Sequence, residues 1–175
     1  DDQISVYPVF ETLNIKPLYH LRPLPLRETK FILDVNLGKL ARYLRMFGFD
    51  TLFSNTFQDP EIVDISIKEH RIILTRDVGI LKIGKVTHGY WIRNTHIKQQ
   101  TQEVLEHFDL YRDIKPFSRC MLCNGLIETT EKHNIHHRLP QRTLKYFNEF
   151  YICKSCDKIY WKGSHYKKMK EFISL

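Results

Sequence analysis

Four cysteines arranged as two CxxC pairs constrain this chain more than any other feature. The pairs are Cys120-Met-Leu-Cys123 and Cys153-Lys-Ser-Cys156, and they contain every cysteine of the 175 residues. A CxxC segment turns back so that both sulfurs face one point, and two such segments supply the four thiolates of a closed tetrahedral zinc site. Because a closed shell leaves no position for substrate, the spacing predicts a zinc ion that holds the fold.

Two disulfides are the competing interpretation of the same cysteines. We expect a cytoplasmic protein without a hydrophobic leader, and paired CxxC motifs in an intracellular protein indicate metal. Three histidines between the pairs, His133, His136 and His137, are alternative ligands, but the four cysteines already complete a zinc shell.

Composition indicates a packed globular protein with a polyanionic partner. Hydrophobic residues make up 42% of the chain, and no apolar run approaches the ~20 residues that would span a bilayer, so no membrane partner is expected. The net charge of +7 favours nucleic acid, although many basic proteins bind nothing acidic.

The order of apolar segments predicts the domain organisation. Residues 31–33, 49–54, 71–75 and 88–93 have the pattern of strands, and helical periods lie between and after them. This alternation is typical of an α/β fold with a parallel sheet and helices on both faces. We predict three parts: a strand and proline-rich linker at 1–29, an α/β domain at 30–115, and a zinc module at 116–175.

Three aspartates are candidate metal ligands. Asp34 follows the first predicted strand directly, Asp77 follows the third, and Asp59 begins the second helix. Ligands collect beyond the carboxyl ends of parallel strands, and clustered carboxylates bind the Mg²⁺ or Mn²⁺ used in phosphodiester cleavage. The alternative is that all three aspartates only cap helices.

Basic residues near these acids are candidates for binding a nucleic-acid backbone. Lys39, Arg42 and Arg45 recur every three residues along the first helix, and Arg76 precedes Asp77. The solvated face of an amphipathic helix is the alternative explanation of the stripe. The chain has no nucleophile elbow, P-loop or dinucleotide fingerprint, so those enzyme classes are excluded.

Five segments in order match a known family. They are FILDVNLGKLARYLRMFGFDT at 31–51, DPEI at 59–62, ILTRD at 73–77, FSRCMLCNGL at 117–126 and FYICKSCDKIYWKGSH at 150–165. Together they resemble the Mut-seven C-terminal RNase family, a PIN-like nuclease domain with an appended zinc ribbon. Residues 4–10 resemble the last strand of the ubiquitin-like β-grasp domain that often precedes this unit.

The resemblance implies specific roles for the residues above. It places catalytic Mg²⁺ or Mn²⁺ at Asp34, Asp59 and Asp77, and structural zinc at Cys120, Cys123, Cys153 and Cys156. PIN nucleases commonly gather four acids, and the fourth is not obvious in this chain; the candidates are Asp50, Glu61 and Asp64, while Asn36 offers a neutral oxygen.

The predicted function is therefore a metal-dependent ribonuclease. Lys39, Arg42, Arg45, Arg76 and Arg119 would bind RNA, and Tyr160, Trp161 and His165 would stack bases or form the core of the zinc module. The first alternative is a non-catalytic RNA-binding adaptor, with ribosome or tRNA association. The second is a protein-interaction module that pairs through the strand around Tyr7.

Overall fold

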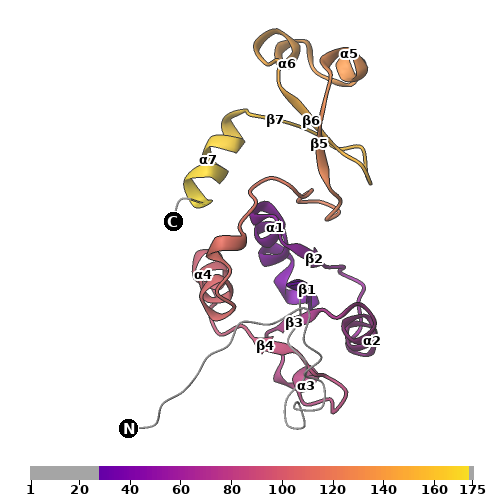
Figure 1. The fold of residues 1–175 in the computed structure, drawn as a ribbon, viewed down its shortest axis with the longest axis vertical. Helices are drawn as coiled ribbons and strands as arrows, with labels where there is room; N and C mark the ends of the chain where they lie inside the picture. Colours follow the sequence, from indigo (N-terminus) through magenta and orange to yellow (C-terminus); the bar gives the residue numbers. More distant parts are fainter. Residues whose placement is uncertain (1–27, 174–175) are drawn as a thin grey trace, which may run out of the picture.

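Two separate β-sheets organise the protein in the computed structural model, which describes residues 28–173 (Figure 1). The first sheet has four parallel strands in the order β2-β1-β3-β4, and the second has three antiparallel strands in the order β5-β6-β7. The strand and linker predicted for residues 1–27 lie outside the described residues.

The parallel sheet confirms the predicted alternation of strands and helices. Its elements are β1 (Lys30–Leu33), α1 (Gly38–Phe47), β2 (Asp50–Leu52), α2 (Asp59–Glu69), β3 (Ile72–Thr75), α3 (Val78–Leu81), β4 (Gly89–Trp91) and α4 (Ile97–His107), with short 3-10 helices η2 (Val35–Leu37) and η3 (Tyr111–Asp113). Helix α1 ends at Gly48, where φ is 99°, a left-handed conformation that favours glycine.

Helices cover both faces of this sheet, because alternate residues of each buried strand point to opposite sides. Phe31 and Leu33 of β1 pack with residues of α1 and α4 in the larger core cluster. Ile32 of β1 and Ile73 of β3 pack with residues of α2 and α3 in the smaller one. The α/β class with helices on both faces is therefore confirmed.

The antiparallel sheet forms a small ribbon module, with Cys153 at the end of β6 and the other three cysteines in the segments next to its strands. Its elements are β5 (Ile127–Thr130), α5 (Lys132–Ile135), η4 (His136–Arg138), α6 (Gln141–Tyr146), β6 (Phe150–Cys153), β7 (Ile159–Trp161) and α7 (Ser164–Ile173). We call residues 116–173 the ribbon module and residues 28–115 the parallel-sheet unit.

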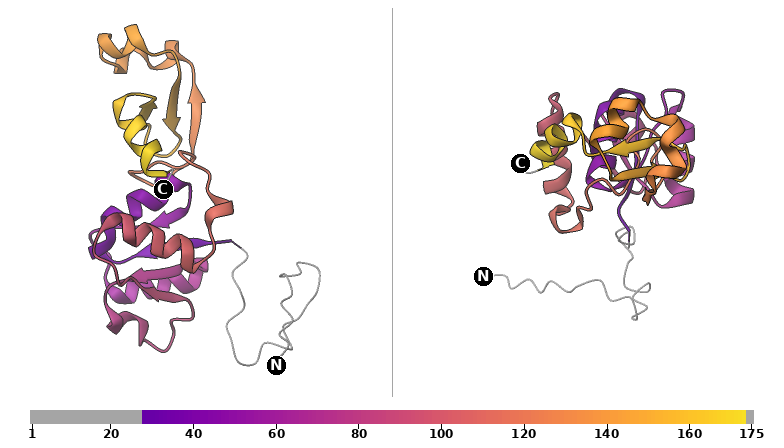
Figure 2. Two further views of the ribbon diagram at one scale, coloured as in Figure 1. Left: turned by 90° about the vertical axis from the view of Figure 1, so that its left-hand side faces the viewer. Right: turned by 90° about the horizontal axis from the view of Figure 1, so that it is seen from above.

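The ribbon module stands beyond strand β2, so the molecule is elongated (Figures 1 and 2). Its last helix, α7, returns to the parallel-sheet unit, and the Phe172 ring packs edge-on against Tyr43 of α1 at 4.4 Å between centroids. The backbone N–H groups of Lys115 and Phe117 donate to the carbonyls of Phe47 and Met46. These contacts fix the connection between the two parts at both ends of the module.

Candidate functional site

Asp34 and Asp77 lie at the carboxyl ends of two neighbouring strands. Strands β1 and β3 pair in parallel, Asp34 directly follows β1, and Asp77 comes two residues after the end of β3. Asp34 is only 5% exposed, whereas Asp77 is exposed. The topology therefore brings these two predicted site residues to the same edge of the sheet.

The Thr75 hydroxyl connects the two aspartates. It donates a hydrogen bond to Asp34 Oδ2 and accepts one of 2.8 Å from the Asp77 backbone N–H. Asp34 also accepts from the N–H groups of Asn36 at 2.8 Å and Arg76 at 2.9 Å. These three donors hold the buried Asp34 carboxylate in one orientation. The sequence analysis did not identify Thr75 as one of them.

Both aspartates also cap short helices, as the alternative interpretation proposed. Asp34 is the N-cap of η2 and Asp77 is the N-cap of α3, where Asp77 Oδ1 accepts from the Gly79 N–H at 2.7 Å. Asp59 does not cap α2: the N-cap is Gln58, and Asp59 is the first helical residue, with Pro60 next to it. Asp59 is exposed, so its carboxylate remains accessible.

The donor atoms at this edge are those that a hard divalent cation prefers, namely carboxylate oxygens. Within residues 28–173, Asp77 Oδ2 has no hydrogen-bond partner, and Asp34 Oδ1, which accepts one hydrogen bond, keeps a lone pair, whereas Asp34 Oδ2 accepts two. In that part of the chain, however, Asp34, Asp59 and Asp77 do not form a group with all ligand atoms within 4.8 Å. The three-ligand Mg²⁺ or Mn²⁺ site thus stays a prediction.

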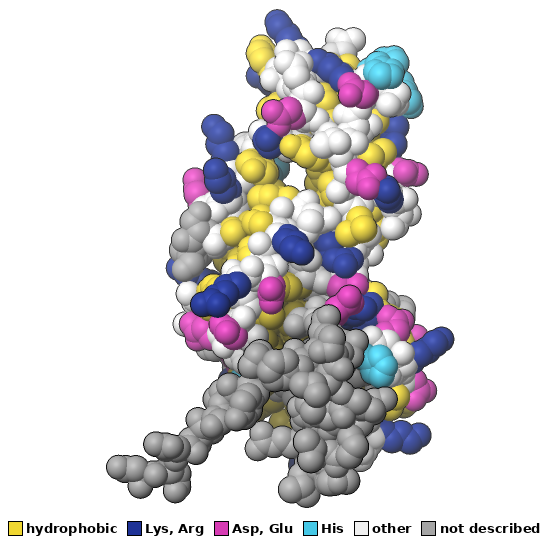
Figure 3. Space-filling view, viewed as in Figure 1, with side chains coloured by type: hydrophobic (Ala, Val, Ile, Leu, Met, Phe, Trp, Pro, Cys, Tyr) yellow, Lys and Arg dark blue, Asp and Glu magenta, His cyan; other side chains and the backbone are white. Residues whose placement is uncertain are grey.

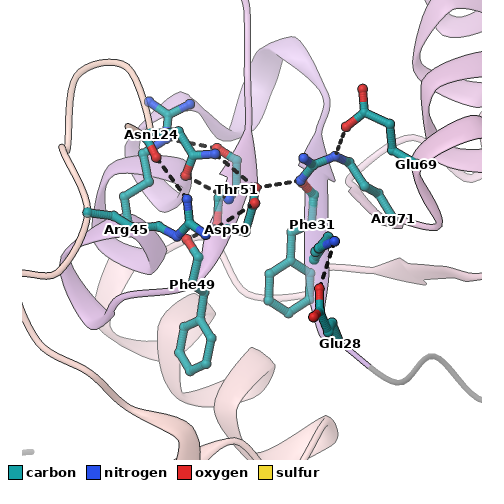
Figure 4. A network of polar contacts seen from close by, with 11 residues as sticks. Glu28, Phe31, Arg45, Phe49, Asp50, Thr51, Glu69, Arg71 and Asn124 are labelled. Atoms are coloured by element: carbon teal, nitrogen blue, oxygen red, sulfur yellow. Dashed lines mark hydrogen bonds and ion pairs between the residues drawn. The ribbon is translucent and has the colours of Figure 1, made fainter. Parts of the chain in front are cut away.

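Of the fourth-acid candidates, Asp50 is committed elsewhere. Its carboxylate binds the Arg71 guanidinium at 2.6 Å, the Asn124 amide at 2.8 Å and Arg119 at 3.3 Å (Figure 4). Burial raises the pKa of Asp50, but the hydrogen bonds from Arg71 and Asn124 lower it more, so the net pKa lies below the ordinary value. Glu61 and Asp64 are exposed on α2.

Among the predicted RNA-binding residues, Lys39, Arg42 and Arg76 are exposed, but Arg45 is buried at 4% exposure. A helix turns ~100° per residue, so a step of three residues falls ~60° short of a full turn and two steps fall ~120° short. The three-residue stripe therefore rotates from the solvated face of α1 at Lys39 to the buried face at Arg45. Arg45 therefore does not present the exposed guanidinium that the predicted RNA contact assumes.

Arg45 instead joins α1 to β2 and the first CxxC segment. Its Nε donates to the Thr51 carbonyl at 2.8 Å, and its Nη1 donates to the carbonyls of Leu122 at 2.8 Å and Met121 at 3.3 Å. Burial lowers the pKa of Arg45, and the nearby Cys120 and Cys123 thiols oppose that shift. The residue thus connects the parallel-sheet unit to the first CxxC segment of the ribbon module.

Asn124 completes this junction from the ribbon side. It accepts a hydrogen bond from the Thr51 N–H at 2.9 Å and donates one to Asp50, and its φ of 71° is a left-handed conformation that asparagine tolerates (Figure 4). Arg119 donates to the Asn124 carbonyl at 3.0 Å and pairs with Asp50, so this predicted RNA contact is also engaged in the junction.

The four cysteine sulfurs lie together as the CxxC spacing predicted. All four are free, and their Sγ atoms lie within 4.8 Å of one another, with Cys120 and Cys156 at 3.7 Å and Cys123 and Cys153 at 3.4 Å. Tetrahedral zinc with ~2.3 Å bonds needs sulfurs ~3.8 Å apart, so the residues fit a zinc ion. Among described residues, the three histidines are not in this group.

Tyr160 contacts the cysteine cluster of the ribbon module. Its hydroxyl lies 3.0 Å from Cys120 Sγ. Burial raises the pKa of Cys120, but this hydrogen bond and those from the backbone N–H groups of Cys123 and Leu122 lower it to about 7. These hydrogen bonds favour a thiolate at Cys120, the form that binds metal, whereas burial raises the pKa of Cys123 to about 12. Trp161 is half-buried and His165 is exposed.

Trp91 is a further residue at the edge where Asp34 and Asp77 lie, and the sequence analysis overlooked it. It ends β4, lies opposite Thr75 in the β3–β4 register, and is 42% exposed. Its Nε1 donates to the Arg76 carbonyl at 3.3 Å, and the Arg93 guanidinium lies 5.7 Å from its ring centroid. The only signal in the sequence was a tryptophan within the predicted strand 88–93, because its exposure and its pairing with Thr75 follow from the fold.

Comparisons with known proteins agree with this architecture. No helix within residues 28–173 is long and apolar enough to cross a membrane. Searches of the curated proteins and of the solved structures found no significant match. A family model, the Mut7-C RNAse domain, matches residues 29–173, which include both the parallel-sheet unit and the ribbon module. The chain therefore belongs to the Mut7-C RNase domain family.

Proposed function

We propose that the protein is a ribonuclease that hydrolyses RNA phosphodiester bonds with Mg²⁺ or Mn²⁺ at the edge where Asp34 and Asp77 lie. The observation that carries this proposal is the position of both carboxylates at the ends of neighbouring strands, with Thr75 hydrogen-bonded to both residues. Membership of an RNase family supports RNA as the substrate.

Each residue at this edge has a role that its surroundings support. Asp34 offers carboxylate oxygens held in place by three donors, Asp77 offers an exposed carboxylate, and Asp59 adds a third from the start of α2. A bound divalent cation would polarise the phosphate and lower the pKa of water. Arg76 and Lys39, exposed near the same edge, would bind the RNA phosphates.

In the same proposal, zinc at the four cysteines is structural. The four thiolates complete a tetrahedral shell, so no ligand position is left for substrate. The metal would hold the first CxxC segment in the shape that presents the Leu122 carbonyl to Arg45 and the Asn124 amide to β2.

One observation favours the non-catalytic adaptor as a second candidate. Asp34 and Asp77 each cap a short helix, so a structural role accounts for them without any metal. The ribonuclease and the adaptor predict different effects of Asp77→Asn on cation binding. Asparagine keeps the shape and the capping oxygen of the side chain but removes the charge that binds a cation.

The test compares Asp77→Asn with Asp109→Asn as a matched control. Asp109 is exposed, lies just after α4, and has a φ of 51°, which asparagine also tolerates. The proteins are incubated with end-labelled RNAs with and without added Mn²⁺ or Mg²⁺. We expect cation-dependent cleavage that falls by orders of magnitude in Asp77→Asn, with RNA affinity kept, and stays at the wild-type rate in Asp109→Asn.

Cleavage by Asp77→Asn at the wild-type rate would contradict the catalytic assignment. Binding of Mn²⁺ is measured in parallel by the paramagnetic resonance of the free ion. If the wild type and Asp77→Asn bind Mn²⁺ equally, the carboxylate caps a helix and the adaptor is the better account.

A further inference from the structure

The positive charge of the protein is concentrated in its C-terminal third. Residues 116–175 contain 11 of the 27 Lys and Arg residues but only 5 of the 20 Asp and Glu residues, so they carry +6 of the net charge of +7. Residues 1–115 are close to neutral. Because phosphate attraction scales with local positive charge, most of the attraction for RNA comes from the ribbon module and not from the part with the candidate acids.

An aromatic cavity of about 330 Å³ opens between the strands of the ribbon module and α7. Its lining includes five aromatic side chains and two methionines, which are Phe117, Tyr151, Tyr160, Trp161, Tyr166, Met121 and Met169. Figure 3 shows a hollow between α7 and the ribbon strands, with hydrophobic side chains on both walls. The volume lies within the range of ~300–1,000 Å³ that is usual for small-ligand pockets.

Cationic side chains border this cavity. Lys162 and Arg119 are among its lining residues, and Lys162 also lies 5.9 Å from the ring centroid of Tyr151 on the same wall. Lys162 is paired with Glu149, but Lys167 and Lys168 of α7 are exposed. Flat aromatic faces next to cations are the combination that binds an unpaired base together with its phosphate.

The cavity and the candidate acids lie toward opposite ends of α1. Asp34 lies four residues before the start of this helix, whereas Arg45 and Phe47 at its far end contact Leu122 and Phe172 of the ribbon module. A ten-residue helix is ~15 Å long. At ~3.4 Å per nucleotide along a stacked strand, this length corresponds to at least about four nucleotides.

We propose that this cavity binds one unpaired base of a single-stranded RNA, so that the ribbon module anchors the substrate several nucleotides from the cleavage edge. The inference rests on the proposed function in taking RNA as the substrate. The base lies against Trp161 and Tyr166, and the neighbouring phosphates lie along Lys162 and the lysines of α7.

The experiment measures binding without cleavage, so its outcome is independent of catalysis. The probes are a fluorescent twelve-nucleotide oligouridylate and an abasic oligoribonucleotide of the same length and charge, titrated without added divalent cation and read by anisotropy. Trp161→Ala removes one wall, and Ile127→Phe narrows the cavity while keeping every aromatic side chain. Tyr146→Ala removes a tyrosine that is 63% exposed in the same module and does not line the cavity.

We expect the wild type to bind oligouridylate more tightly than the abasic probe by roughly tenfold, the usual size of one base stack. Trp161→Ala and Ile127→Phe should each remove most of that preference, and Tyr146→Ala should keep it. Equal affinity of the wild type for both probes would overturn the proposal, as would an unchanged preference in folded Trp161→Ala and Ile127→Phe. The latter result is the one expected if a protein segment fills the cavity.

If Trp161→Ala does not fold, Ile127→Phe alone tests the proposal, because it fills part of the cavity and keeps every aromatic side chain that lines it. A base preference that is present in the wild type and lost in the cavity variants supports the anchor even if no cleavage is detected. Absence of cleavage with intact binding would then count against the proposed ribonuclease activity only.

Discussion

Replacing Arg45 with methionine tests whether this residue holds the two parts of the protein together. Methionine has a similar length but no donor, so the variant leaves the carbonyls of Thr51 and Leu122 without their 2.8 Å hydrogen bonds. A lost hydrogen bond to a charged group costs ~1.5–3 kcal/mol. Because the third bond, to Met121, is longer at 3.3 Å, we expect a total loss of about 3–4 kcal/mol in the free energy of unfolding.

Arg42→Met is the matched control, since Arg42 lies one turn earlier on the same helix and is exposed. Surface substitutions usually change stability by no more than ~0.5 kcal/mol. Thermal melts should show a Tm lowered by roughly 10 °C for Arg45→Met, at ~2–4 °C per kcal/mol for a chain of this size, and almost no change for Arg42→Met.

Equal melting temperatures of the two variants would refute this account of Arg45. Reduced RNA affinity of Arg45→Met with an unchanged Tm would return Arg45 to the RNA-binding stripe. The two outcomes are separated by measuring both quantities on the same preparations.

Three further predictions concern the junction between the two parts and the edge where Asp34 and Asp77 lie. Because the folded-state pKa of Asp50 is lowered, its carboxylate stabilises the fold at neutral pH, and this stability is lost as the pH falls below about 4. In urea titrations at decreasing pH, the free energy of unfolding should therefore fall less for Asp50→Asn than for the wild type. Removing zinc with a chelator should speed hydrogen exchange at the Thr51 amide, which donates to Asn124, while the Ile73 amide in the buried centre of β3 stays protected. Equal exchange rates of the Thr51 amide with and without metal would disprove the coupling between the cysteine site and β2. Thr75→Val should weaken Mn²⁺ binding by ~10- to 100-fold in a calorimetric titration, because the hydroxyl that orients Asp34 is lost. An unchanged affinity would show that the Thr75 hydroxyl is dispensable.

Local sequence signals were sufficient to predict the parallel-sheet unit. The apolar runs 31–33 and 71–75 were predicted as strands and form β1 and β3, and Gly48 adopts the left-handed conformation that favours a glycine at a helix stop. The positions of Asp34 and Asp77 followed from strand ends alone, because parallel strands end at one edge.

The junction could not be predicted because its contacts join residues far apart in the sequence. Asn124 and Thr51 are 73 positions apart, and nothing in either local pattern indicates that one amide would bind the other. The burial of Arg45 was missed for a local reason, since a spacing of three residues approximates one helical turn but drifts over two steps. Thr75 was missed because a threonine inside a strand usually marks only β propensity.

The contacts at Thr51 also cover an edge strand that could otherwise pair with a strand of another copy of the protein. Strand β2 is at the edge of the parallel sheet, and its outward N–H is bound by Asn124 of the ribbon module. An uncovered edge strand is a template for pairing with a strand of another molecule. A fragment ending at Lys115 would expose that edge in every copy, so we expect it to self-associate through β2. The ribbon module would then have a second role, as a cover on one edge of the parallel sheet.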